Sequence, residues 1–256
     1  MNDRQIWDAA ADSFQRSFEL GLNDYNRRLL SFLEENEMIY PGCRAADVGC
    51  GVGTYGRELK KRGCEVTLID ISPKMLEYAE HNMAVPGPQH RSLLLDFASE
   101  RIEGSFDFSI AAMSPAVSEA EAVKKLDAMT TGTCFITRFC SWEQPDRDRV
   151  LSLCGLPTTD TRDKHKRGLD ELIGAISSVG ITPCIRYEDY CWCDKLTAAE
   201  TVEKLARHCS AASGSELEKK LLSAVTELSE NGTRAINDFI APLYQGYHFS
   251  PGSTDV

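Results

Sequence analysis

Residues 45–56, which read AADVGCGVGTYG, contain two overlapping glycine motifs that would serve different chemistry. Counted from Gly51, the stretch is a GxGxxG motif, and Asp70 follows at about the distance expected of an acid that holds the ribose of a bound dinucleotide. Counted from Asp47, it is an acid followed by three glycines at alternate positions. The frame that the chain uses depends on where the preceding strand ends.

Short apolar runs alternate with helical patterns between residues 44 and 140, which predicts an α/β fold. The apolar runs, each expected to contain a strand, are residues 44–49, 65–70, 91–97, 106–113 and 133–140, and the expected helices between them are 54–62, 73–82 and 118–129. Strands that are apolar throughout and separated by helices are typical of a parallel sheet covered on both faces. The right-handed crossover rule makes this a doubly wound sheet.

The end of the first expected strand decides between the two frames. That strand ends at Val48, which makes Gly49 the glycine at its carboxyl end, where open parallel sheets bind their ligands. The GxGxxG frame begins two residues later and would place Gly56 inside the next helix, where we expect it to permit close packing on the sheet. The frame that begins at Asp47 therefore fits the strand better.

The Asp47 frame resembles motif I of the class I S-adenosylmethionine-dependent methyltransferases, in which the first strand ends in Asp or Glu followed by GxGxG. Further strand ends agree with that family in their order along the chain, over about residues 40–140. The residues that carry this agreement are Asp70, Ile71, Asp96, Phe97 and Met113. The resemblance implies a seven-stranded, mostly parallel, doubly wound sheet with N-terminal helices and a helical insertion before the last strand.

The resemblance also implies that the first strand end holds the methionine part of the cofactor. Gly49, Gly51 and Gly53 would let the backbone approach the methionine and ribose portions closely, because they carry no Cβ atom. Cys50 would lie in this cofactor loop as a small residue rather than a nucleophile. Asp47 would attract the methionine ammonium, directly or through water, and the next helix would receive the carboxylate at its N-terminus.

The next three strand ends are expected to hold the nucleoside. By the resemblance, Asp70 would accept hydrogen bonds from both ribose hydroxyls, and Ile71 would pack on adenine. Asp96 would meet the adenine amino group with Phe97 beside the ring, and Met113 would lead to the sulfonium. Two alternatives stay open: Asp70 could cap the following helix, and Asp96 could serve only in a turn.

The chain shows no recognisable catalytic base or triad, so the catalytic residues stay unassigned. In-line methyl transfer needs mainly positioning and desolvation, with a base only where the acceptor is protonated. The expected fourth-strand exit at 113–116 lacks the second proline and the aromatic residue of the amino-methyltransferase signature, which argues against a nucleic-acid or glutamine substrate. Trp7, Ser114 and Trp142 are the candidate residues of the acceptor pocket.

The charge of the chain also favours a small-molecule partner. It has 28 Lys and Arg against 39 Asp and Glu, a net charge of −11 at pH 7. Such a surface repels nucleic acid and anionic membranes, so we expect neither as a partner. No apolar stretch approaches the roughly 20 residues of a membrane span, and the first residues are polar rather than a basic leader. We therefore expect a cytoplasmic protein.

The ten cysteines are spread along the chain without a CxxC pair, which removes the commonest zinc and redox spacings. Reduced, mostly buried thiols and no metal are the expected state. Cys191 and Cys193 offer an alternative, because residues two apart in a strand face the same side. Together with Cys184 and Cys209 they could hold a soft metal or metalloid.

These observations predict four segments. Residues 1–40 would be an N-terminal helical cap, 41–194 a Rossmann-like core that binds S-adenosylmethionine, 195–235 a helical insertion that caps the substrate, and 236–256 the last core strand and a tail. The expected function is methyl transfer from S-adenosylmethionine to a small-molecule acceptor.

Two other functions stay open. One is an NAD(P)-dependent oxidoreductase, which rests on the GxGxxG frame alone, and the other is a non-catalytic regulatory protein that binds the cofactor. The sequence does not determine the acceptor, its reacting atom (O, N, S or C) or the oligomeric state.

Overall fold

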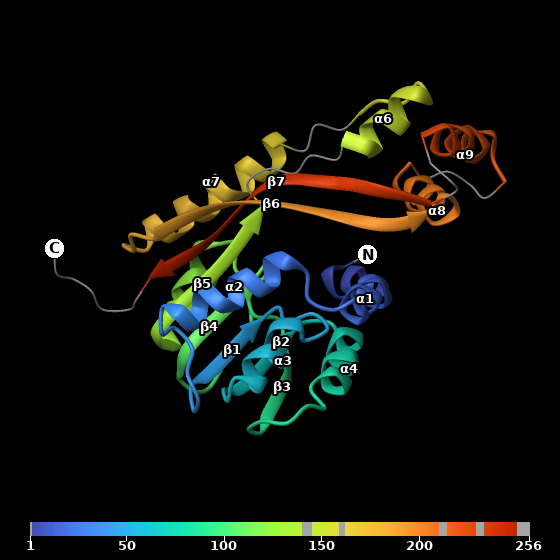
Figure 1. Cartoon of the computed structure of the whole chain (residues 1–256). Helices are drawn as coiled ribbons and strands as arrows, with labels where there is room; N and C mark the ends of the chain where they lie inside the picture. The colour runs from blue at the N-terminus through green and yellow to red at the C-terminus, as the bar shows by residue number, and fades with distance from the viewer. Residues whose placement is uncertain (1, 140–144, 159–161, 210–213, 229–232, 250–256) are drawn as a thin grey trace. The chain divides into compact units, whose positions relative to one another are not determined.

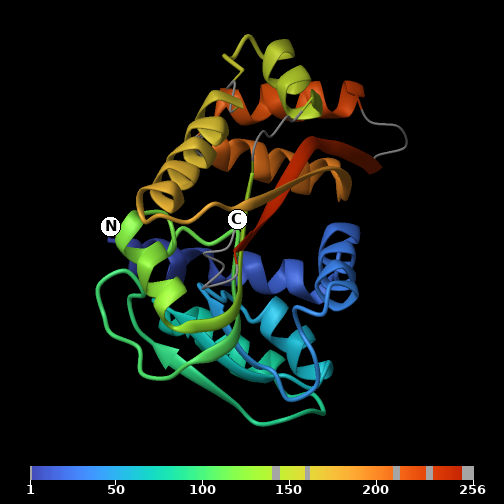
Figure 2. The same cartoon turned by 90° about the vertical axis from the view of Figure 1, so that its left-hand side faces the viewer.

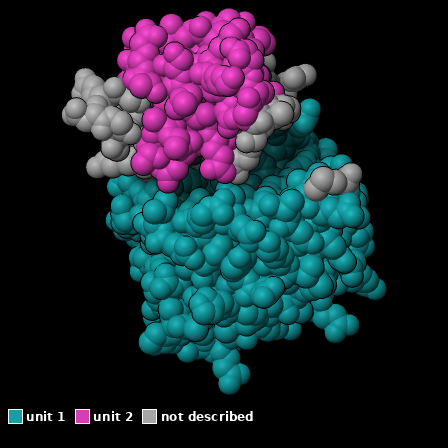
Figure 3. Space-filling view, turned by 90° about the vertical axis from the view of Figure 1, so that its right-hand side faces the viewer, with its two compact units in different colours: residues 1–139, 167–187, 244–256 teal, residues 140–166, 188–243 magenta. Residues whose placement is uncertain are grey.

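The structure, a computed structural model, describes residues 2–139, 145–158, 162–209, 214–228 and 233–249. The chain forms two compact units, coloured teal and magenta in Figure 3. Unit 1 is drawn from residues 1–139, 167–187 and 244–256, and unit 2 from residues 140–166 and 188–243.

Helices and strands alternate along most of the chain (Figure 1). The strands are β1 (Arg44–Val48), β2 (Glu65–Asp70), β3 (His90–Leu94), β4 (Phe106–Ala112), β5 (Thr130–Phe139), β6 (Cys184–Thr197) and β7 (Thr233–Phe249). The helices are α1 (Asp3–Glu19), α2 (Asp24–Glu35), α3 (Thr54–Lys61), α4 (Pro73–Asn82), α5 (Ala120–Ala128), α6 (Pro145–Leu153), α7 (Arg162–Ser178), α8 (Ala198–His208) and α9 (Glu216–Leu228).

The strands β1 to β5 form a parallel sheet, which confirms the predicted α/β fold. Each neighbouring pair among them is parallel, with Asp47 of β1 level with Leu68 of β2 and Ile110 of β4. In the described part of the chain the strand order is β3-β2-β1-β4-β5-β7-β6. The order therefore reverses direction between β1 and β4, and a reversal of this kind marks the place where open α/β sheets bind ligands.

The core strands are buried because their sequences are apolar on both faces. In β1 and β2 every residue after the first is buried, and the fully buried side chains include Leu68, Ile110 and Phe135. Strand β3 lies at the edge and is only partly buried. Figures 1 and 2 show these strands side by side with helices packed along them.

The predicted core elements lie where the sequence placed them, apart from small shifts at their ends. Helix α4 occupies the expected residues 73–82, and its N-cap is Ser72, whose hydroxyl accepts the N–H of Met75 at 3.1 Å. The third strand was predicted too long, since β3 ends at Leu94 and the chain enters a turn at Asp96.

The N-terminal segment forms two helices, and α1 is held along α4 by polar contacts. Asp12 of α1 pairs with Lys74 Nζ at 2.8 Å and accepts the Tyr78 hydroxyl at 2.7 Å. One helical turn further along, Gln15 exchanges hydrogen bonds with Asn82. These contacts fix α1 beside the loop that follows β1, because the Asn82 side chain also donates to the Val52 carbonyl at 2.9 Å.

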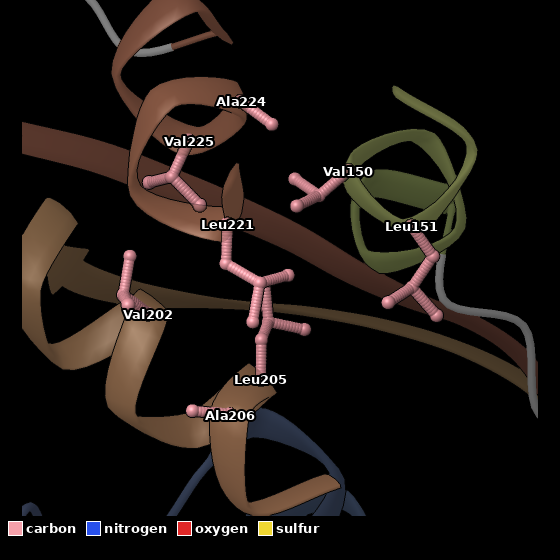
Figure 4. Close-up of a cluster of buried hydrophobic side chains, with 8 residues drawn as sticks. All are labelled: Val150, Leu151, Val202, Leu205, Ala206, Leu221, Ala224 and Val225. Carbon is pink, nitrogen blue, oxygen red and sulfur yellow. The ribbon is translucent and has the colours of Figure 1, made fainter. Parts of the chain in front are cut away.

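Unit 2 has a hydrophobic core of its own, which packs α6, α8 and α9 together (Figure 4). Its buried residues are Val150, Leu151, Val202, Leu205, Ala206, Leu221, Ala224 and Val225. Helices α8 and α9 lie in the segment 195–235, which is predicted to cap the substrate. Helix α6 lies in the segment 41–194, which is predicted to be the core.

Among the described residues, no helix is both long enough and apolar enough to cross a membrane.

Candidate functional site

The candidate site lies at the carboxyl ends of β1, β2 and β4, where the strand order reverses. Strand β1 ends at Val48 as predicted, so Gly49 is the first residue beyond the sheet. Gly49, Gly51 and Gly53 all have positive φ angles, of 68°, 53° and 79°. Helix α3 begins directly afterwards, and its N-cap residue Gly53 has no side chain to cap it. The loop 49–53 is called the glycine loop below.

Gly49 brings the exits of β1 and β4 into contact. A Cβ atom at Gly49 would lie 2.7 Å from Ser114 Cβ and would overlap Ser114 Oγ. Gly56 has the packing role expected of it, because a Cβ atom there would overlap the Leu68 side chain of β2. Only glycine fits at these two positions, one against the β4 exit and the other against the sheet.

Asp47 lies beneath the glycine loop with its side chain almost fully buried. Its carboxylate oxygen Oδ2 accepts the backbone N–H of Gly56 at 2.9 Å, which ties the loop to the first turn of α3. The pKa of Asp47 is raised to about 7: burial raises it most, the charge of Asp70 adds to this, and the amide of Gly56 acts in the opposite direction. A cation close to this carboxylate would favour its ionised form.

Asp70 joins the glycine loop to the turn that follows β2. Its Oδ2 accepts the N–H of Gly51 at 2.8 Å, and its Oδ1 accepts the N–H of Ser72 at 2.9 Å. Burial raises the pKa of Asp70, and these amides act in the opposite direction. The N-cap of α4 is Ser72 rather than Asp70. A carboxylate offers about four acceptor positions, so Asp70 can accept a further donor beside these amides.

Ile71 follows Asp70 in the chain, and the Cys50 thiol lies close enough to feel the charge of Asp70. Ile71 is partly buried, and its carbonyl accepts a hydrogen bond from Arg4 Nε of α1 at 3.1 Å. Cys50 is buried, and desolvation raises the pKa of its thiol far above the usual value. A protonated, buried thiol suits a packing residue, because nucleophilic cysteines need a lowered pKa and some exposure.

Asp96 and Phe97 already have partners in the turn after β3. Asp96 accepts the N–H of Ala98 at 3.0 Å and the hydroxyl of Ser99 at 2.8 Å. Phe97 is buried, with Lys125 Nζ 4.5 Å from the centre of its ring. These contacts give both residues a structural role, and their contact with adenine stays a prediction.

The exit of β4 supplies Met113 and Ser114. Met113 has a positive φ angle of 57°, which is uncommon outside glycine and asparagine. Its N–H donates to the carbonyl and the hydroxyl of Thr137 on β5, at 3.2 and 3.0 Å. Ser114 is buried, and its hydroxyl accepts the N–H of Ala116 at 3.3 Å.

Thr137 is a residue that the sequence reading missed. Its signal was present, since a threonine interrupts the apolar run FITRF of the expected fifth strand. Threonine is mostly exposed in proteins, and a fully buried one needs a partner for its hydroxyl.

Of the three residues predicted to line the pocket for the methyl acceptor, Ser114 and Trp7 lie in the described part of unit 1. Trp7 of α1 is partly buried and packs against a cluster formed by Ala11, Met75 and Val52 of the glycine loop. The ring centres of Trp7 and Phe14 lie 6.1 Å apart in a T-shaped arrangement. Trp142 lies outside the described residues.

The described residues give no support to the alternative that cysteines hold a soft metal or metalloid. Within the described ranges, no group of three or more His, Cys, Asp and Glu side chains could hold a metal ion. Cys184 is exposed and Cys209 is partly buried. The side chains of Cys191 and Cys193 lie outside what the structure describes.

Comparison with known families agrees with this geometry. Residues 45–132, which contain the glycine loop, Asp70 and the β4 exit, match the family described as "Methyltransferase domain". Residues 45–132 are therefore similar to a methyltransferase domain. The match confirms the family resemblance that the strand-end motifs indicated.

Two curated relatives are similar over part of their length. Magnesium-protoporphyrin O-methyltransferase of Rhodobacter capsulatus is 28% identical over 118 residues, which are 46% of this chain and 42% of that protein. Ubiquinone biosynthesis O-methyltransferase of Dechloromonas aromatica is 31% identical over 88 residues, 34% of this chain and 38% of that protein. The chain thus spans about two fifths of the length of the curated relatives that it matches.

Solved structures share the fold at low sequence identity. The DhpI complex with S-adenosylhomocysteine is 12% identical with a TM-score of 0.51, over 71% of this chain and 87% of that one. YjhP from E. coli is 15% identical with a TM-score of 0.50, over 85% of this chain and 91% of that one. These likenesses support the α/β methyltransferase fold with its mostly parallel sheet.

Proposed function

We propose that the chain transfers a methyl group from S-adenosylmethionine to a small-molecule acceptor by in-line displacement. The carrying observation is the arrangement at the reversal between β1 and β4, where the glycine loop, the Asp70 carboxylate and the Ser114 side chain meet. The names of the curated relatives support a small acceptor, since they describe O-methyltransferases of a porphyrin and of ubiquinone biosynthesis.

The residues present fit the charges and hydroxyls of S-adenosylmethionine. Asp70 would accept hydrogen bonds from the two ribose hydroxyls, and its charge would strengthen both. Asp47 supplies a buried negative charge for the methionine ammonium. The methionine carboxylate would bind at the N-terminus of α3, whose N-cap residue Gly53 has no side chain. We keep Ile71, Asp96 and Phe97 as the proposed adenine contacts.

The cofactor supplies an already activated methyl group, so the protein's part is to place and desolvate the acceptor. We propose Met113, Ser114, Trp7 and Trp142 as residues beside the acceptor, and leave a catalytic base unassigned. A base is needed only when the acceptor atom carries a proton at the working pH.

We infer the remaining organisation from the family. It comprises a seven-stranded sheet with N-terminal helices and a helical insertion at 195–235, before the last strand, that caps the acceptor. The net charge of −11 supports a small-molecule partner over nucleic acid. We also propose that the enzyme works in the cytoplasm, where its free cysteines would stay reduced.

Thermal unfolding with S-adenosylhomocysteine and with NAD, each in separate samples, tests this proposal. A ligand that binds only the folded state raises the melting temperature. At a concentration of one hundred times its Kd it adds about 2.7 kcal/mol to the free energy of unfolding. We expect stabilisation by S-adenosylhomocysteine and none by NAD. Stabilisation by NAD alone would favour the oxidoreductase instead. Binding of S-adenosylhomocysteine without methylation of any compound in a metabolite extract would favour a regulatory protein.

A further inference from the structure

The backbone of Met113 is strained, and its positive φ angle is not explained by the end of a helix, where such angles are ordinary. Among the described residues other than glycine, only Glu37 and Met113 have positive φ angles. Glu37 directly follows the C-cap of α2, where a left-handed residue is ordinary. Met113 follows a strand, at the point where β4 leaves the sheet for the candidate site. Backbone strain at such a place is a reason to look for function.

Thr137 holds Met113 in this conformation from the neighbouring strand. The two strands pair with Ala112 level with Thr137, so the residue after Ala112 lies beside the Thr137 side chain. Thr137 is fully buried, and its hydroxyl and carbonyl both accept the Met113 N–H. Valine would fill the same volume without a hydroxyl.

The next residue of β5 holds the other end of the same segment. Arg138 donates to the Val117 carbonyl at 2.6 Å and to the Ser118 hydroxyl at 3.3 Å. Two consecutive residues of β5 therefore fix residues 113–118 at both ends. Between these ends, Ser114 touches Gly49 of the glycine loop.

We propose that Thr137 is a positioning residue for methyl transfer, whose hydroxyl keeps Met113 in the left-handed conformation and so fixes Ser114 against the glycine loop. This role rests on the proposed function. Thr137 is buried and acts through Met113, so it is not itself a contact of the reacting atoms. In-line displacement is sensitive to such placement, because a misplacement of about 1 Å can cost about a hundredfold in rate.

The test compares Thr137→Val, which removes the hydroxyl, with Thr137→Ser, which keeps it. Thr130→Val is the matched control: Thr130 is also buried on β5 and bonds through its hydroxyl, but at the opposite end of the strand. Each variant is measured for S-adenosylhomocysteine affinity by calorimetry. Transfer from tritium-labelled S-adenosylmethionine to the wild-type acceptors in a metabolite extract gives the rate, and hydrogen exchange reports on the Met113 amide.

We expect Thr137→Val to lower the transfer rate at saturating cofactor by about ten- to a hundredfold, with S-adenosylhomocysteine affinity within about threefold of wild type. Its Met113 amide should exchange faster. Thr137→Ser should restore both properties, and Thr130→Val should keep them.

Two outcomes would overturn the role of Thr137 alone: a transfer rate in Thr137→Val within twofold of wild type, or an equal loss in Thr130→Val. Wild-type protein that fails to bind S-adenosylhomocysteine would overturn the proposed function and this role together.

Discussion

Gly49 and Ser114 are in direct contact across the ends of β1 and β4, although they lie 65 positions apart in the sequence. A Cβ atom at Gly49 would lie 2.7 Å from Ser114 Cβ, closer than such atoms come in folded proteins. Because the strand order reverses between these two strands, their contact fixes the glycine loop relative to the β4 exit at the ligand-binding edge of the sheet. The shape of the proposed site therefore depends on this contact.

Gly49→Ala should disrupt both the fold and cofactor binding. The left-handed backbone costs alanine about 1–2 kcal/mol, and overpacking against Ser114 adds about 1–3 kcal/mol. Urea unfolding would measure the loss of stability, and calorimetry the loss of S-adenosylhomocysteine affinity.

Gly42→Ala is the control, because Gly42 has a φ of +86° but nothing within 4 Å of an added Cβ atom. It should show the backbone cost alone. Adding Ser114→Gly to Gly49→Ala should recover part of the stability. A double variant as unstable as Gly49→Ala would mean that the Ser114 side chain is not the cause.

Asp70→Asn should weaken S-adenosylhomocysteine binding. Hydrogen bonds to a charged acceptor contribute about 1.5–3 kcal/mol each, so loss of charge at a ribose-binding carboxylate predicts at least a tenfold rise in Kd. Asp107→Asn is the comparison, since Asp107 pairs with Arg44 at the amino end of β4, away from the site. Equal affinities in wild type and Asp70→Asn would remove Asp70 from the ribose site.

The glycine loop and the core strands could be predicted because their signals are local. Continuous apolar runs are typical of strands that are buried on both faces. Alternate glycines directly after such a strand predict a tight loop with positive φ angles, because glycine adopts them without strain. Asp96 shows the limit of such signals. Its position after an apolar run predicts a contact with adenine, which stays a prediction. The bonds of its carboxylate to Ala98 and Ser99 depend on how the turn closes, which the local sequence does not determine.

Features that depend on the pairing of distant segments could not be predicted. The strain at Met113 follows from the register of β4 on β5, which places Thr137 beside it. Likewise, α6 joins α8 and α9 in unit 2, although α7 and β6 lie between them in the sequence. A helical pattern shows that a segment has an apolar face, but not which segment covers it.

The core of unit 2 can be tested with two neighbouring leucines of α9. Leu221 is fully buried in the cluster with Val150 and Leu205, whereas Leu222 is 48% exposed. Leu221→Ala should cost about 2–5 kcal/mol of stability, because it leaves a cavity. Leu222→Ala should change stability by no more than about 0.5 kcal/mol. Urea unfolding measures both, and equal effects of the two substitutions would contradict the packing shown in Figure 4.

The burial of Asp47 predicts that stability falls as pH rises. In the folded chain its pKa is about 7, above the ordinary value of 3.8, so between these pH values the folded state holds a proton that the unfolded state has released. The free energy of unfolding should therefore decrease with pH in that window, by up to about 1.4 kcal/mol per pH unit from this group. Burial also raises the pKa of Asp70, which contributes in the same direction.

Asp47→Asn separates this effect from those of the other titrating groups, because asparagine is close in size and carries no charge. Urea unfolding of wild type and variant at pH 5, 6, 7 and 8 gives the difference in stability at each pH. We expect this difference to shift in favour of the variant as pH rises from 5 to about 7 and then to level off, since the buried charge is fully developed above the folded pKa. A difference that stays constant from pH 5 to 8 would mean that Asp47 is already ionised in the folded chain at pH 5.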